Sequence, residues 1–182
     1  MITKIVSGGQ TGADLGGLHA ARELDIATGG YAPADFMTED GPDPSLRDFG
    51  LVEVRDGSVG YFSRTRLNVL HSDGTLIVGD PRSPGSASTI GLCNKHRKPC
   101  LIVKWPLSVV TGGLRLRPSP QDVSMGIENT ERFRRWVELR GIHTLNVAGN
   151  RESVAPGIHD AVVNFLVEAI DDQAWLFKEP EE

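Results

Sequence analysis

Residues 2–24 read ITKIVSGGQTGADLGGLHAAREL, and this stretch decides the fold. It opens with a β-rich run, residues 2–6, which stops just before Gly8 and Gly9. After the glycine turn, apolar residues recur at helical spacing over residues 13–24. A strand, a glycine turn and a helix in this order form the first part of a βα unit, which is typical of a parallel sheet.

The same alternation continues along the chain. Further strands are predicted at residues 51–54, 75–78, 99–105 and 144–148, and further helices at residues 63–71, 86–96, 129–140 and 156–170. We expect Asn129 to cap the helix that it opens, and Pro156 to lie in the first turn of the last helix. The remaining stretches are an irregular segment at residues 27–60, an insertion at 105–124 with a hairpin near 114–116, and an acidic tail at 171–182. The pattern predicts one α/β domain, residues 1–182, with an open, mostly parallel sheet and helices on both faces.

Composition excludes several classes of protein. Hydrophobic residues make up 39% of the 182 residues and charged residues 24%, which is typical of a globular chain and not of a disordered one. The net charge of −5 disfavours a dedicated nucleic-acid binder, and no apolar run is long enough to span a membrane. The first residues lack the apolar core of a signal peptide, so we expect a cytoplasmic protein with Cys93 and Cys100 reduced. The five histidines do not fall at metal-ligand spacing, and we expect no metal site.

Three predicted strands end in polar loops that contain glycine. In a parallel sheet all three loops lie along one edge, the edge at which such sheets bind ligands. The candidate ligand-binding residues in these loops are Gly8, Gly9, Gln10, Thr11, Gly12, Gly85, Ser86, Ser88, Thr89, Gly149, Asn150, Arg151 and Glu152.

The first two loops each lead into a helix, where free N–H groups and the helix dipole favour an anion. We expect an oxyanion to lie against residues 8–12 or residues 85–89. Asp14 makes residues 85–89 the preferred place for a phosphate, and residues 8–12 would then hold a sugar, a pterin or a bridging cation. The alternative is that the glycines only make tight turns and that Ser86 only caps its helix. Gly12 is followed by Ala13 and not by Lys-Ser or Lys-Thr, so the first loop is not a Walker A loop. It does not match G-x-G-x-x-G either.

Three charged or amide side chains extend this candidate site. Asp14, at the helix start, fits either a contact with the helix dipole or a contact with a ribose hydroxyl, a metal or a water. Arg64 and Asn68 share one helix face, and Arg64 could bind a phosphate through two hydrogen bonds. The alternative for Arg64 is a solvated basic face with Arg66. Arg151 and Glu152 could simply pair with each other.

Several motifs together resemble the family of molybdenum-carrier proteins, within a Rossmann-like superfamily that includes the lysine-decarboxylase-like cytokinin phosphoribohydrolases. The resemblance spans residues 2–166. It rests on SGGQTGAD at 7–14, EDG at 39–41, RTRLN at 64–68, DGT at 73–75, and NVAG at 146–149 followed by RES at 151–153. It implies a Rossmann-like fold, a homo-oligomer and a phosphorylated ligand at the strand ends, either the pterin molybdenum cofactor or a nucleotide.

The resemblance is incomplete. Asn150 stands where relatives often have proline, residues 81–84 lengthen the approach to Gly85, and the Pro-Gly-Gly-x-Gly-Thr loop of the phosphoribohydrolases is missing. A molybdenum-cofactor carrier is therefore the first hypothesis. The alternatives are cleavage of the N-glycosidic bond of a nucleoside monophosphate and a nucleotide-sensing module. Cleavage would need a carboxylate, for which the candidates are Asp14, Glu39, Asp40 and Glu152.

Overall fold

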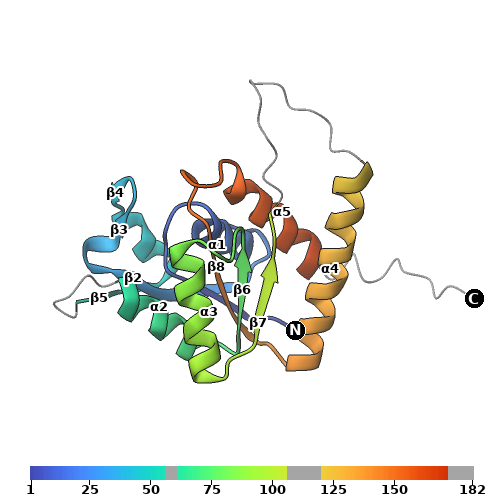
Figure 1. Cartoon of the computed structure of the whole chain (residues 1–182). Helices are drawn as coiled ribbons and strands as arrows, with labels where there is room; N and C mark the ends of the chain where they lie inside the picture. Colours follow the sequence, from blue (N-terminus) through green and yellow to red (C-terminus); the bar gives the residue numbers. More distant parts are fainter. Residues whose placement is uncertain (56–60, 106–119, 172–182) are drawn as a thin grey trace, which may run out of the picture.

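The structure is a computed structural model of the chain. It describes residues 1–55, 61–105 and 120–171, with only the backbone for residues 120–127. Six parallel strands form one sheet in the order β5-β2-β1-β8-β6-β7 (Figure 1). Their bounds are β1 Lys4–Ser7, β2 Ala27–Pro33, β5 Leu51–Val54, β6 Gly74–Val78, β7 Cys100–Val103 and β8 Thr144–Gly149.

Helices cover both faces of this sheet (Figure 1). On one face α1 (Ala13–Glu23) packs against α5 (Ile158–Ile170), and α5 packs against α4 (Pro120–Arg140). On the other face α2 (Tyr61–Leu70) packs against α3 (Pro84–His96). The predicted α/β, Rossmann-like architecture is confirmed.

The main core lies between the sheet and the face formed by α1, α4 and α5. Ile5 and Leu145 on the strands, Phe133 on α4 and Leu166 on α5 are almost fully buried there. A smaller cluster joins Leu18 to the segment after β2. Burying side chains of this size contributes about 1.5–3 kcal/mol each, which fixes the strand ends relative to the helix starts.

The prediction that residues 27–60 are irregular was wrong for its first part. Residues 27–33 form β2, which pairs with β1 on one side and β5 on the other. Its sequence ATGGYAP has a weak strand propensity. Pairing on both sides outweighs that propensity, as often happens in sheets. The glycines fit tight packing, because a Cβ on Gly30 would lie 2.2 Å from the backbone oxygen of Ser7.

Two short 3-10 helices and a small hairpin follow β2: η1 Ala34–Phe36, β3 Met37–Thr38, β4 Gly41–Pro42 and η2 Pro44–Phe49. β5 lies where the sequence predicted a strand.

The starts of α4 and α5 also differ from the prediction. Helix α4 begins at Pro120, so Asn129 lies inside it rather than capping it, and residues 120–124 are helical rather than inserted. The predicted hairpin at 114–116 lies outside the described residues. Helix α5 begins at Ile158 after Gly157 in the left-handed conformation, so Pro156 precedes the helix.

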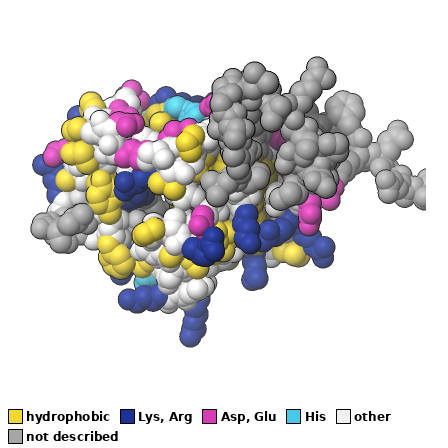
Figure 2. All heavy atoms as spheres, turned by 45° about the horizontal axis from the view of Figure 1, so that its top comes forward, with side chains coloured by type: hydrophobic (Ala, Val, Ile, Leu, Met, Phe, Trp, Pro, Cys, Tyr) yellow, Lys and Arg dark blue, Asp and Glu magenta, His cyan; other side chains and the backbone are white. Residues whose placement is uncertain are grey.

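The surface of the described chain carries charges of both signs. In Figure 2, basic and acidic side chains are interspersed with hydrophobic ones on the face shown. Within the described residues, no helix combines the length and the apolar character that crossing a membrane requires.

Candidate functional site

A cleft of about 400 Å³ opens at the carboxyl ends of the strands, next to the starts of α2 and α3. This volume lies within the range of small-molecule sites. Its lining joins segments that are far apart in the sequence: Gln10, Asp14, Tyr61, Phe62, Arg64, Thr65, Asn68, Ser83, Pro84, Gly85, Ser88, Thr89, Asn146, Ala148, Gly149, Asn150, Arg151 and Val154.

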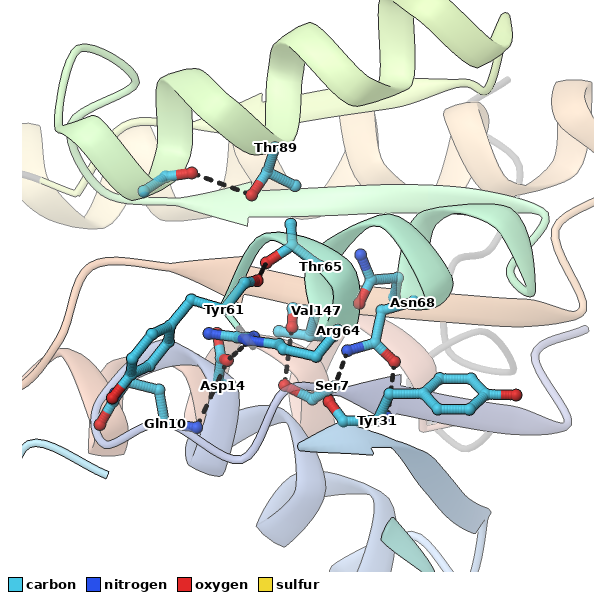
Figure 3. Close-up of polar contacts among 12 residues, drawn as sticks. Ser7, Gln10, Asp14, Tyr31, Tyr61, Arg64, Thr65, Asn68, Thr89 and Val147 are labelled. Carbon is cyan, nitrogen blue, oxygen red and sulfur yellow. Dashed lines mark hydrogen bonds and ion pairs between the residues drawn. The ribbon is translucent and has the colours of Figure 1, made fainter. Parts of the chain in front are cut away.

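An ion pair between Arg64 and Asp14 lies in the wall of the cleft (Figure 3). Arg64 Nη1 donates to Asp14 Oδ2 over 3.0 Å, and both side chains are largely buried. Gly8 makes room for this pair, since a Cβ there would lie 1.4 Å from Arg64 Nη1. Burial raises the pKa of the Asp14 carboxyl, and the charge and hydrogen bond of Arg64 oppose that rise. The alternative of a solvated basic face is therefore wrong for Arg64.

Two buried donors in the cleft wall have no partner among the described residues. Gln10 uses its Oε1 to accept from the N–H groups of Thr11 and Glu39, at 3.1 Å and 2.8 Å, which leaves Nε2 without an acceptor. Arg64 Nε is likewise buried and unpaired. Buried polar groups are nearly always hydrogen-bonded, and the described residues supply no acceptor for either donor.

Asn68 has a structural partner. Its side-chain oxygen accepts from the N–H of Tyr31 at 2.8 Å, and its nitrogen donates to the Tyr31 carbonyl at 3.0 Å (Figure 3). These bonds fasten α2 to β2, so the side chain lines the cleft while its amide is used by the fold.

The segment at residues 85–89 is helical rather than a loop. Helix α3 begins at Pro84, and the cleft lies against its first two turns. The first N–H groups of a helix have no intrahelical partner, and they favour an anion there. A Cβ on Gly85 would meet open space, and the exposed Ser88 also borders the cleft. Ser86 is buried and bonded to Ser83, outside the cleft lining.

The glycines of the first loop pack against protein. A Cβ on Gly9 would lie 2.7 Å from Leu46, and one on Gly12 would lie 2.6 Å from the backbone of residues 150 and 152. Neither glycine lines the cleft, and neither does Thr11. A larger residue at Gly9 would therefore collide with the core beneath the loop.

Residues 5–170 match the family model cpYpsA, described as the circularly permutated YpsA SLOG family. The chain belongs to this family. It is also similar to a solved crystal structure, that of a putative molybdenum carrier protein from Syntrophus aciditrophicus SB. The two share 32% identity with a TM-score of 0.76, over 93% of this chain and 95% of the other. No curated protein matches the chain significantly. The resemblance to molybdenum-carrier proteins is confirmed.

The end of β8 and the loop after it complete the cleft of this SLOG family member. Gly149 at the strand end and Asn150 and Arg151 in the loop line it. Asn150 Oδ1 accepts from the N–H of Asp80 at 2.6 Å, which ties the ends of β6 and β8 together. Glu152 does not line the cleft. Its carboxylate accepts from the N–H groups of Gly157 and His159, so it caps α5 instead of pairing with Arg151.

Glu39, a candidate carboxylate in the sequence analysis, does not line the cleft. Its carboxylate accepts from the hydroxyls of Thr11 and Ser153 and from the N–H of Ser153. These bonds join the β3–β4 turn to the loop after β1 and to the loop after β8. Burial would raise the pKa of Glu39, but these hydrogen bonds outweigh it and hold the pKa below its usual value. Its motif, EDG, was visible in the sequence, but its spatial partners depend on the fold of residues 27–50.

The cleft residues that the sequence analysis missed are Tyr61, Phe62, Thr65, Ser83, Pro84, Asn146, Ala148 and Val154. Asn146 carried a signal, because an amide in the middle of an apolar strand needs a partner. It donates to Thr75 Oγ1 at 3.2 Å.

Proposed function

We propose that this chain binds a small phosphorylated ligand in the strand-end cleft, as a carrier of the pterin molybdenum cofactor or as a nucleotide-binding protein. The observation that carries the proposal is the pair of buried, unpartnered donors, Gln10 Nε2 and Arg64 Nε, in the cleft wall. The name of the Syntrophus protein favours the molybdenum cofactor among phosphorylated ligands.

The charges of the cleft support an anionic ligand. Among its described lining residues, Arg64 and Arg151 are cationic and Asp14 is acidic. Arg64 already donates Nη1 to Asp14, which leaves the Nε side of its guanidinium for a phosphate oxygen. The first turn of α3 adds backbone N–H groups on the opposite wall. A phosphate between these two walls satisfies donors on both.

The experiment is calorimetric titration with inorganic phosphate, ribose 5-phosphate, AMP and a pterin phosphate. We choose Arg64→Lys as the variant because it keeps a cation beside Asp14 but removes the second donor edge. It should weaken binding by about tenfold or more, the effect expected for one charged hydrogen bond. The matched control is Arg66→Lys, on the exposed side of the same helix. Equal dissociation constants for Arg64→Lys and the parent would contradict the proposal.

Cleavage of an N-glycosidic bond is the second candidate function, and Asp14 favours it. Asp14 is the only carboxylate among the described lining residues of the cleft, and burial raises its pKa. Glu39 and Glu152 are occupied by loop and helix contacts, and Asp40 is exposed outside the cleft. Chromatography for free base after incubation with nucleoside monophosphates tests this function, with Asp14→Asn as the comparison. Release of base by the parent alone would favour the enzyme over the carrier.

A further inference from the structure

Two histidines meet between α1 and α5, away from the cleft. The Nδ1 atom of His19 lies 2.7 Å from the Nε2 atom of His159, and the ring planes meet at 82°. The other nitrogen of His159, Nδ1, lies 2.8 Å from a carboxylate oxygen of Asp160. Both rings are only partly exposed. These contacts make a chain of three polar groups across the largest helix–helix contact of the described fold.

The hydrogen-bond chemistry fixes the direction of this chain. An ionised carboxylate can only accept, so Nδ1 of His159 carries a hydrogen and its Nε2 presents a lone pair. That lone pair accepts the hydrogen on Nδ1 of His19. A single hydrogen therefore lies between the two rings.

The surroundings disfavour protonation of both imidazoles at once. Partial burial, the neighbouring His159 and the cation of Arg22 together lower the pKa of His19. From η2, the uncharged ring of Phe49 packs against His19 with centroids 5.4 Å apart. Two further charged groups lie on α1: the exposed Glu23, and Asp14, which is paired with Arg64. Helix α5 carries Asp160 and the exposed Glu168, and Glu152 caps it. From η2 come the exposed Asp48 and Arg47, which is paired with Glu53.

We propose that His19 and His159 form a pH-sensitive latch between α1 and α5, which is closed while one hydrogen is shared and opens once both imidazoles are protonated. In the doubly protonated pair, two N–H donors and two positive charges face each other across the 2.7 Å contact. Among the described residues, no group of three or more His, Cys, Asp or Glu side chains is arranged to hold a metal ion. The latch adjoins the loop after β8, because Glu152 in that loop holds the N–H of His159.

The sign of the pH dependence follows from the lowered pKa. In the unfolded chain His19 binds a proton near its ordinary pKa of 6.5, whereas the folded chain resists that proton. The contribution of the latch to the free energy of unfolding is therefore complete above pH 6.5 and is lost as the pH falls below that value. For each unit by which folding lowers the pKa of His19, the unfolding equilibrium constant rises by about tenfold as the pH falls through this range.

The test measures urea unfolding at pH 7.5 and pH 5.0. In His159→Gln the side-chain oxygen replaces the accepting nitrogen and does not titrate. This variant should match the parent at pH 7.5 and lose much less stability than the parent at pH 5.0. The control is His71→Gln, whose histidine contacts the hydroxyl of Tyr31 on the surface and not a second histidine. The control should lose as much stability on acidification as the parent. A parent and His159→Gln with the same pH dependence would overturn the latch.

A second measurement on the parent keeps the proposal testable if His159→Gln does not fold. Imidazole nuclear magnetic resonance should show His19 titrating with a pKa below its ordinary value. A His19 titration at the ordinary value would overturn the latch. Because neither measurement uses a ligand, its outcome is separate from that of the proposed function.

Discussion

At the scale of single residues, the glycines of the first loop allow the close contacts that build the site. Gly8 leaves space for the guanidinium of Arg64, and Gly12 lets the loop before α1 approach the loop after β8. The sequence analysis interpreted these glycines as the place where a ligand approaches the backbone. The spacing of glycines in the sequence does not show whether a ligand or another part of the protein packs against them. The pairing of Arg64 with Asp14 was missed for the same reason, since fifty residues separate the two side chains.

Glu39 provides a prediction at this scale. Glu39→Gln keeps the shape of the side chain but weakens its bonds to Thr11 and Ser153. Because hydrogen bonds to charged groups are stronger than neutral ones, we expect the free energy of unfolding to fall by about 1 kcal/mol at pH 7. The folded pKa of Glu39 is lowered, so the difference from the parent should shrink as the pH falls below the ordinary value of 4.5. Urea unfolding at pH 7 and pH 4 measures it, and the exposed Glu23→Gln is the control. A difference that persists unchanged at pH 4 would contradict this account.

At the scale of elements, the sequence located those whose pattern is local. The glycine turn and apolar spacing of residues 2–24 predicted β1 and α1 correctly. Strand β2 was missed because its glycines and proline carry no strand signal, and it forms only between β1 and β5. The start of α3 was placed two residues late, which turned helical residues into a predicted loop. Boundaries of this kind depend on packing as well as on propensity.

Two glycines in helices give a matched prediction about elements. A Cβ on Gly17 in α1 would lie 2.7 Å from Val147 on β8, whereas one on Gly91 in α3 would meet open space. Gly91→Ala should therefore raise the free energy of unfolding by about 0.5–1 kcal/mol, through helix propensity. Gly17→Ala should lower it by about 1–3 kcal/mol, through overpacking against the sheet. Urea unfolding of both variants measures the two effects. Equal effects of the same sign would show that α1 is not packed on β8 as described.

At the scale of the whole molecule, the sequence predicted the edge of the sheet at which the candidate residues meet. Parallel strands place the ends of β1, β6 and β8 together, and the cleft is found there. The individual lining was only partly predictable, because Tyr61 and Phe62 enter through the start of α2, which has no loop motif.

The homo-oligomer implied by the family resemblance remains a proposal. Candidate apolar contacts between copies are Trp105, Val109 and Val110. Trp105 packs partly against the main core, and the two valines lie outside the described residues. We expect light scattering at micromolar concentration to give a dimer or a tetramer. A monomeric mass across the concentration range would exclude the assembly.

The most direct test of the central claim is a crystal structure of the chain with ribose 5-phosphate. We predict phosphate oxygens within hydrogen-bond distance of Arg64 Nε and of the N–H groups in the first turn of α3, with Gln10 Nε2 bonded to the same ligand. A ligand that binds in solution but lies outside this cleft in the crystal would contradict the account.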